Sequence, residues 1–93
     1  MDNVFEVIDK TGRKIYLSKE RWKHITIEHS NVTMWHIEET IVNYQKIITN
    51  KDVNNYYAYF KDKKEKSKYL KVVVKYLNGN GFIITAYFVR YMH

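Results

Sequence analysis

The spacing of hydrophobic residues changes between the two halves of the chain. In the first half, short apolar runs at residues 4–8 and 14–17 flank the turn sequence Asp9-Lys10-Thr11-Gly12, which predicts a β-hairpin. Apolar residues then recur at helical spacing over Lys19–Glu28 and Met34–Asn43. Ser18 and Thr33 precede these two segments and are suited to cap a helix. We therefore expect a hairpin followed by two helices.

After residue 45 the hydrophobic period becomes two, and β-branched and aromatic residues dominate. The predicted strands are Lys46–Thr49, Asn55–Phe60, Leu70–Leu77 and Phe82–Tyr91, with a charged connector at Lys61–Lys68. A hairpin, two helices and then consecutive antiparallel strands are typical of an α+β domain. We expect the short hairpin and the two helices to pack on a curved antiparallel sheet of about four strands.

The last two predicted strands can be aligned by their apolar faces. A three-residue loop, Gly79-Asn80-Gly81, with Gly81 left-handed in a bulge, places both apolar faces on the same side. Lys75 then lies opposite Thr85, Val73 opposite Tyr87, and Lys71 opposite Val89. The helices cover the apolar side, so the other face of the sheet displays Lys71, Lys75, Thr85 and Tyr87.

Length and composition exclude several classes of protein. Ninety-three residues suit a single domain over 1–93, and the absence of cysteine excludes disulfide scaffolds, thiolate zinc sites and cysteine nucleophiles. No set of His, Asp and Glu residues has the spacing of a metal site, so we expect neither a metal nor a cofactor. No apolar run reaches the ~20 residues of a membrane span. The start of the chain lacks a signal-peptide pattern. We expect a cytoplasmic protein.

The net charge of +6 is unevenly distributed along the chain. Residues 1–47 carry seven basic and seven acidic side chains, whereas residues 48–93 carry nine basic and three acidic ones. A one-sided basic field attracts polyanions such as RNA. Lys71 and Lys75 on the predicted face suit phosphate binding, and the nearby Tyr57 and Tyr59 offer stacking surfaces for unpaired bases. The alternative is a solvated lysine-rich connector beside ordinary strand tyrosines.

The first predicted helix carries candidates for proton transfer. Arg21, His24 and Glu28 share one stripe, where we expect the carboxylate to orient the imidazole one turn away for proton transfer. The alternative is a solvent-exposed helix surface with an ordinary ion pair. His29 near the helix end suits a C-terminal cap. From spacing alone we expect His36 on the surface and Trp22 and Trp35 in the core.

A basic, aromatic sheet face beside a helix with His and Arg suits RNA cleavage by the ribose 2′-OH, which requires neither a metal nor a protein nucleophile. Two strings support such a function by resemblance. The pattern R-W-x-H-I-x-x-x-H at residues 21–29 and the string T-A-Y-F at residues 85–88 resemble the barnase–EndoU–colicin–RelE ribonuclease superfamily, especially its small phage and toxin members. The resemblance covers about residues 18–90.

The resemblance implies a metal-independent endoribonuclease that cleaves RNA, such as tRNA or mRNA. It implies that His24 is the acid or base, with Arg21 and His29 beside it, that Thr85 binds the scissile phosphate, and that Tyr87 positions a base. The chain departs from those members in having Ser30-Asn31 after His29, where they usually have Pro-Glu. A toxin would also have an acidic antitoxin or immunity protein as a partner.

Two other functions fit the same residues. A non-catalytic RNA-binding module would use the basic, tyrosine-lined face and would have no need for a poised imidazole. A protein-interaction domain would dock an acidic partner on its basic connector and would have no affinity for RNA.

Overall fold

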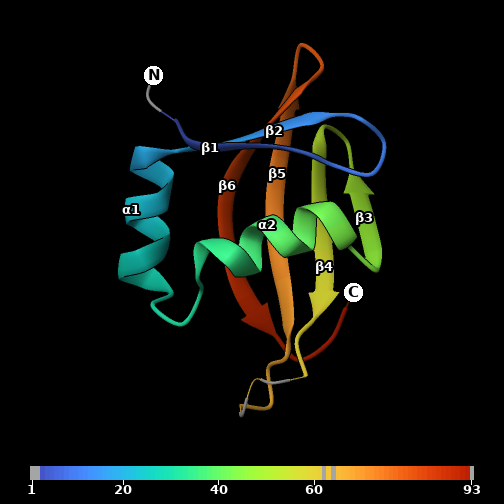
Figure 1. Cartoon of the computed structure of the whole chain (residues 1–93). Helices are drawn as coiled ribbons and strands as arrows, with labels where there is room; N and C mark the ends of the chain where they lie inside the picture. Colours follow the sequence, from blue (N-terminus) through green and yellow to red (C-terminus); the bar gives the residue numbers. More distant parts are fainter. Residues whose placement is uncertain (1–2, 62, 64, 93) are drawn as a thin grey trace.

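The structure is a computed structural model that describes residues 3–61, 63 and 65–92. It is an α+β fold in which two helices pack against a six-stranded mixed sheet of order β1-β2-β6-β5-β4-β3 (Figure 1). Asp62 and Lys64 of the predicted connector lie outside the described residues. The elements are β1 (Asn3–Ile8), β2 (Lys14–Ser18), α1 (Lys19–Glu28), α2 (Met34–Asn43), β3 (Lys46–Asn50), β4 (Val53–Tyr59), β5 (Tyr69–Leu77) and β6 (Asn80–Val89).

Both helices begin and end at the predicted residues, and both predicted caps are present. The Ser18 Oγ accepts a hydrogen bond from the Arg21 amide at 3.1 Å, and the Thr33 Oγ1 accepts one from the His36 amide at 3.1 Å. Each bond satisfies an amide that the first turn of a helix leaves without a partner. Local side-chain chemistry therefore fixes where α1 and α2 start.

The predicted sheet of about four antiparallel strands is wrong in strand number and in pairing. The N-terminal hairpin belongs to the sheet, because β2 pairs in parallel with β6, Ile15 opposite Gly81 and Tyr16 opposite Phe82. Every other pair of neighbouring strands is antiparallel. Hydrophobic alternation shows which residues form strands, but it does not show which distant strand will be the neighbour.

The loop between β5 and β6 also differs from the prediction. Leu77 pairs with Asn80, so the loop has two residues, Asn78 and Gly79, with φ values of 55° and 83°. Two consecutive left-handed residues of Asn-Gly type form the tight turn that suits the twist of a hairpin. Gly81 is not left-handed. It lies inside β6, where an added Cβ would come within 2.6 Å of the Ile15 Cδ1.

The register between β5 and β6 differs from the prediction because β6 contains a β-bulge. Val73 pairs with Thr85 and Val74 pairs with Ile83, so the extra residue is Ile84. The observed pairs are Lys71 with Tyr87, Val73 with Thr85 and Lys75 with Phe82, in place of Lys71 with Val89, Val73 with Tyr87 and Lys75 with Thr85. The two-residue loop alone would put the apolar faces of β5 and β6 on opposite sides. The bulge restores a common side from Thr85 onwards.

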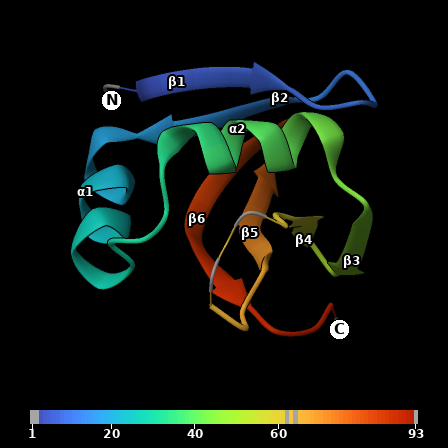
Figure 2. The same cartoon turned by 60° about the horizontal axis from the view of Figure 1, so that its bottom comes forward.

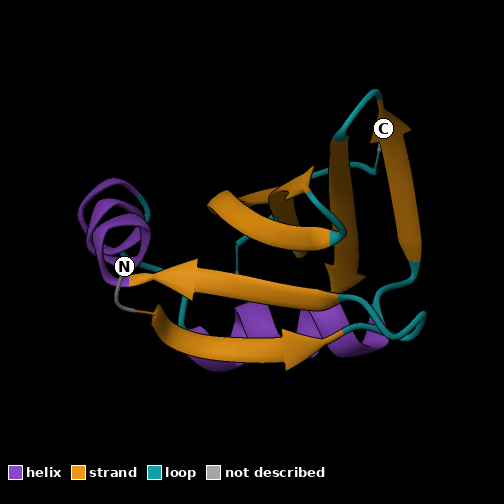
Figure 3. Cartoon of the chain, turned by 90° about the horizontal axis from the view of Figure 1, so that it is seen from above, coloured by secondary structure: helices purple, strands orange, loops and turns teal. Residues whose placement is uncertain are grey.

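The two helices take different positions on the sheet. Helix α2 crosses β4 and β5 and covers one face, where apolar side chains of the sheet and helices are fully buried. The largest of these aliphatic side chains are those of Ile15, Leu17, Ile25, Ile37, Ile41, Leu70 and Ile83. Helix α1 lies beside β6, at the edge where β2 diverges from it (Figure 2). The strand directions rotate strongly from β1 and β2 to β3 and β4 (Figure 3).

Candidate functional site

The sheet face opposite α2, called the open face below, carries the residues that the sequence singled out. Cross-strand pairing places Lys71 beside Tyr87 and Val73 beside Thr85 on this face. The row at the hairpin end joins Tyr16 of β2, Phe82 of β6 and Lys75 of β5. The expected display of Lys71, Lys75, Thr85 and Tyr87 on one face is therefore present, although the predicted register is wrong.

His29, Tyr87 and Lys71 form a contact cluster on the open face. The His29 ring stacks on the Tyr87 ring with a centroid distance of 5.3 Å and an interplanar angle of 30°. The Lys71 Nζ lies 5.6 Å from the centroid of the same ring, within the range of a cation–π contact. His29 is the C-cap residue of α1, and its amide donates to the Ile25 carbonyl at 2.7 Å. The end of α1 thus holds an imidazole against β6.

Thr85 lies on the same strand two residues before Tyr87 and is half-buried. Its hydroxyl and the Lys71 ammonium belong to neighbouring strands of one face. A hydroxyl, an ammonium and an imidazole on adjoining positions supply a hydrogen-bond donor, a positive charge and a proton-transfer group. The arrangement can bind a phosphate and exchange a proton close to it.

The structure places His24 differently from His29. His24 is exposed, and among the described residues no hydrogen bond, ring contact or ion pair joins it to Glu28 or to the sheet. Arg21, one turn earlier, lines a hollow of about 220 Å³ beside β6. The predicted stripe of Arg21, His24 and Glu28 therefore exists as a helix face, but the contact with Tyr87 belongs to His29.

The predicted tyrosine platform is only partly accessible. Tyr57 is 1% exposed, so its ring is not available for stacking on a base, and this prediction is wrong. Tyr59 is 43% exposed and packs against Tyr69 across the strands at a centroid distance of 5.2 Å. Of the two tyrosines, only Tyr59 presents ring surface to a ligand.

The described strands contribute an excess of positive charge to the open face. Lys46, Lys71 and Lys75 project from β3 and β5, as their pairing with residues of this face requires. The acidic side chain on the same face of β1, Glu6, pairs with Lys14 at 3.7 Å. This pair leaves the three lysines as the source of the positive field over the open face.

A buried polar cluster under the β1–β2 turn was not anticipated from the sequence. Asp9 is 4% exposed, and its carboxylate accepts hydrogen bonds from Thr11, from Arg13 and, at 2.7 Å, from the Tyr56 hydroxyl. The hydroxyls of Tyr56 and Tyr76 are hydrogen-bonded to each other, and Arg13 lies over the Tyr76 ring at 4.6 Å. The turn chemistry of Asp9 is visible in the sequence, but its tyrosine partners are not.

The cluster shifts the ionisation of its members. Burial raises the pKa of Asp9, but hydrogen bonds from Thr11, Tyr56 and the Arg13 backbone outweigh it, so the net pKa lies below the usual value. Burial and the hydrogen bonds with Tyr76 and Asp9 raise the pKa of Tyr56 far above its usual range. Asp9 is therefore an anion solvated by protein groups, and Tyr56 remains neutral.

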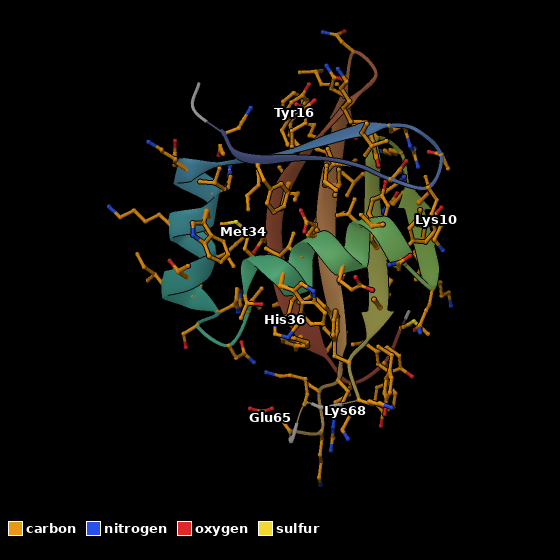
Figure 4. All side chains as sticks on the ribbon, viewed as in Figure 1. Lys10, Tyr16, Met34, His36, Glu65 and Lys68 are labelled. Atoms are coloured by element: carbon orange, nitrogen blue, oxygen red, sulfur yellow. The ribbon has the colours of Figure 1, made fainter. Side chains whose placement is uncertain are left out.

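The predicted positions of two residues of α2, His36 and Trp35, are also wrong. His36, which is labelled in Figure 4, is buried and accepts a hydrogen bond from the Thr33 amide through Nδ1 at 3.1 Å. Its ring lies edge-on to the rings of Phe60 and Phe88. Its position three residues after the N-cap lets the ring complete a capping box. Trp35, expected in the core, is 57% exposed.

A larger hollow of about 400 Å³ lies between α2 and β4, away from the cluster on the open face. It is lined by the exposed Trp35 together with polar groups of Glu39, Asn43 and Gln45. The Gln45 Oε1 accepts from the Tyr59 amide at 3.2 Å and so continues the β3–β4 ladder beyond its last pair. No imidazole or lysine of the candidate site lines this hollow.

Comparisons with models of protein families, with curated proteins and with solved structures gave no match for this chain. Within the described ranges, no group of three or more His, Cys, Asp or Glu side chains could hold a metal ion. Neither helix in the described part of the chain is long and apolar enough to cross a membrane. The function must therefore be argued from the chemistry of the open face.

Proposed function

We propose that this chain is a metal-independent endoribonuclease whose active site is the open face beside α1. The observation that carries the proposal is the contact of His29 with Tyr87, beside Lys71 on a face with an excess of lysines. The other residues expected at the site are Arg21 and His24, which lie on α1, and Thr85, which lies on β6. The superfamily resemblance of residues 21–29 and 85–88 supports the same reaction.

The reaction needs two proton transfers and stabilisation of charge. The 2′-oxygen forms a bond to phosphorus while the bond from phosphorus to the 5′-oxygen breaks. The proton of the 2′-OH passes to a base, and an acid gives a proton to the leaving 5′-oxygen. His29 serves at one of these oxygens, and the exposed His24 of the same helix is the candidate for the other. Lys71 and Thr85 stabilise the negative charge that develops on the phosphate oxygens.

A second function uses the same face without cleavage. The lysines of β3 and β5 and the exposed ring of Tyr59 would suit an RNA-binding module. The stacking of His29 on Tyr87 favours the nuclease, because RNA binding alone does not need an imidazole at that position. As a nuclease, the protein would act on tRNA or mRNA in the cytoplasm as a toxin or phage effector, with an acidic protein as its neutralising partner.

The nuclease proposal is tested by incubating the purified chain with tRNA, mRNA and ribosomes in the presence of EDTA. We expect cleavage that leaves 2′,3′-cyclic phosphate and 5′-hydroxyl ends. His29→Gln should slow cleavage by roughly 10²–10⁴-fold, the usual contribution of a general acid or base. Thr85→Val, which keeps the shape of the side chain, should also slow it.

The matched control is Glu38→Gln, which changes an exposed carboxylate of α2, the helix on the opposite face of the sheet. This variant should cleave like the unaltered chain. Intact RNA in every reaction at micromolar protein would contradict the nuclease function. Full activity of folded His29→Gln would show that His29 is not at the reacting atoms, even if the chain cleaves RNA.

A further inference from the structure

The hollow between α1 and the start of β6 is separate from the cluster of His29, Tyr87 and Lys71. Its volume is about 220 Å³, and its lining combines aromatic, aliphatic and polar groups. The hollow is smaller than the ~300–1,000 Å³ of sites for drug-sized ligands, so it suits one planar ring and not a whole nucleotide. The lining residues are Tyr16, Ser18, Arg21, Phe82, Ile83 and Ile84.

Two aromatic rings form one wall of this hollow. Tyr16 and Phe82 stack with a centroid distance of 5.6 Å and an interplanar angle of 24°, and Phe82 remains 38% exposed. Figure 4 shows Tyr16 at the hairpin end of the sheet, away from α2. Exposed aromatic rings beside lysines are the common platform for unpaired bases, and Lys75 lies directly opposite Phe82.

The bulge in β6 lies at the same place. Ile84 has no partner in the ladder with β5, and the parallel ladder with β2 ends at Phe82. In the Cα register of the described residues, Ile84 therefore has no residue opposite it in either ladder, and it lines the hollow. Bulges recur next to active sites, where they change the direction of a side chain or end the strand pairing.

The side chains around the hollow favour one type of base edge. Arg21 offers guanidinium N–H donors and has no hydrogen-bonded or ionic partner for them among the described residues. The Ser18 Oγ accepts from the Arg21 amide, which leaves its own hydrogen to donate. Among the described residues, no acidic side chain lines the hollow. A donor-rich wall matches carbonyl oxygens of a base, which guanine and uracil present where adenine and cytosine present amino groups.

We propose that this hollow is a base-recognition site for RNA, which holds one unpaired keto base, guanine or uracil, against Phe82. This inference rests on the proposed action of the open face on RNA. Phe82 and Tyr87 are separated by roughly 15 Å along β6 at the usual strand rise. A base in the hollow thus belongs to a nucleotide that flanks the phosphate held at the His29, Tyr87 and Lys71 cluster. The hollow sets which sequence is cleaved.

The test is a titration of the isotope-labelled chain with the four nucleoside 3′-monophosphates, followed by the amide NMR signals of Phe82 and Ile84. GMP and UMP should give saturable shifts at these two amides, with dissociation constants roughly five- to tenfold lower than those of AMP and CMP. Inorganic phosphate should not shift them. Equal affinity for all four nucleotides, or no saturable shift at these amides, overturns the proposal.

Three variants separate the contributions of Arg21 and Phe82 to nucleotide binding. Arg21→Gln should remove the preference for keto bases, and Phe82→Ala should weaken the binding of all four nucleotides. Leu77→Ala is the matched control, since Leu77 is an apolar residue of the adjacent strand with 59% exposure that does not line the hollow. It should bind like the unaltered chain. Folded Phe82→Ala that binds GMP and UMP with unchanged affinity also overturns the proposal.

The same proteins are then assayed on RNA. Cleavage without base binding in the hollow overturns this inference and leaves the nuclease function standing. Keto-base binding in the hollow without cleavage supports this inference and removes the nuclease function.

Discussion

Asp9 is the clearest case in this chain of a single residue that holds two distant segments together. Its carboxylate lies at the turn between β1 and β2 and accepts a hydrogen bond from Tyr56 in β4. A buried carboxylate is costly unless its oxygens are hydrogen-bonded, and here Thr11, Arg13 and Tyr56 all donate to it. The position of the hairpin relative to β4 therefore depends on Asp9 being charged.

Asp9→Asn should make the protein less stable at neutral pH and less sensitive to acid. The folded pKa of Asp9 lies below its ordinary value of 3.8. Its stabilisation is therefore complete well above pH 3.8 and is lost as the pH falls through the folded pKa. We expect the variant to lose about 2–4 kcal/mol of unfolding free energy at pH 7, because charged hydrogen bonds in a buried site are removed.

Urea unfolding at pH 7 and at about pH 3 measures both effects. Asp52→Asn is the control, since Asp52 is an exposed carboxylate in the turn between β3 and β4. Its unfolding free energy at pH 7 should match that of the unaltered chain. An Asp9→Asn protein whose stability falls with acid as steeply as that of the unaltered chain would remove Asp9 as the source of the effect.

Individual elements could be predicted from the sequence much better than the contacts between them. Ser18 and Thr33 start the helices as predicted, because a cap depends on residues within one turn. The sequence predicts the extra residue in the loop and the structure has it at Ile84, because one extra residue at either place gives the same alternation of faces. Local patterns thus fix the elements and the faces, but not the register.

In the candidate site, too, the residues on each element could be predicted, but the contacts between elements could not. The stripe of Arg21 and His24 follows from helical spacing, and Lys71 and Tyr87 follow from strand alternation. The contact of His29 with Tyr87 does not follow, because it depends on where α1 lies beside β6. The burial of Tyr57 is likewise a property of the assembled sheet, since alternation assigns it to the open face.

The junction between β2 and β6 predicts a specific packing defect. Gly81→Ala should lower the unfolding free energy by about 1–3 kcal/mol, because the new methyl group would lie 2.6 Å from the Ile15 Cδ1 and 2.9 Å from the Val74 Cγ1. Ile15→Val removes the nearer of these atoms. Combined with Gly81→Ala, it should therefore cost less than the sum of the two single changes.

Chemical denaturation of the two single variants and the double variant gives this coupling energy. If the losses of unfolding free energy are additive, β2 can move away from β6 at no cost. That result would contradict the prediction, which rests on the close approach of Ile15 to Gly81.

At the scale of the whole molecule, the positive charge divides into two groups. Lys71 and Lys75 lie on the open face, whereas Lys61 and Lys66 belong to the loop between β4 and β5 and are exposed. Both groups contribute to the net charge of +6. Only the first group lies on the same sheet face as Phe82 and Tyr87, so the two groups should differ in how they bind RNA.

The salt dependence of RNA binding distinguishes the two groups of lysines. Each phosphate neutralised on a single strand contributes about 0.7 to the slope of log affinity against log salt. Lys71→Ala combined with Lys75→Ala should therefore reduce the slope by roughly 1.4. The matched pair, Lys61→Ala with Lys66→Ala, should reduce it by less. Fluorescence anisotropy with a labelled single-stranded RNA measures the slope, and equal reductions would place the RNA on the loop as much as on the open face.

The parallel pairing of β2 with β6 has a consequence for the order in which the chain becomes ordered during synthesis. Segments at opposite ends of the sequence form neighbouring strands, and both Ile15 and Leu17 are fully buried in the finished sheet. A ribosome releases the β1–β2 hairpin long before β6 exists. Until then β2 is an edge strand with apolar side chains and free backbone groups. The sheet can close only after Gly81 and Phe82 have left the ribosome, so β2 has no neighbour on this side until β6 has been synthesised.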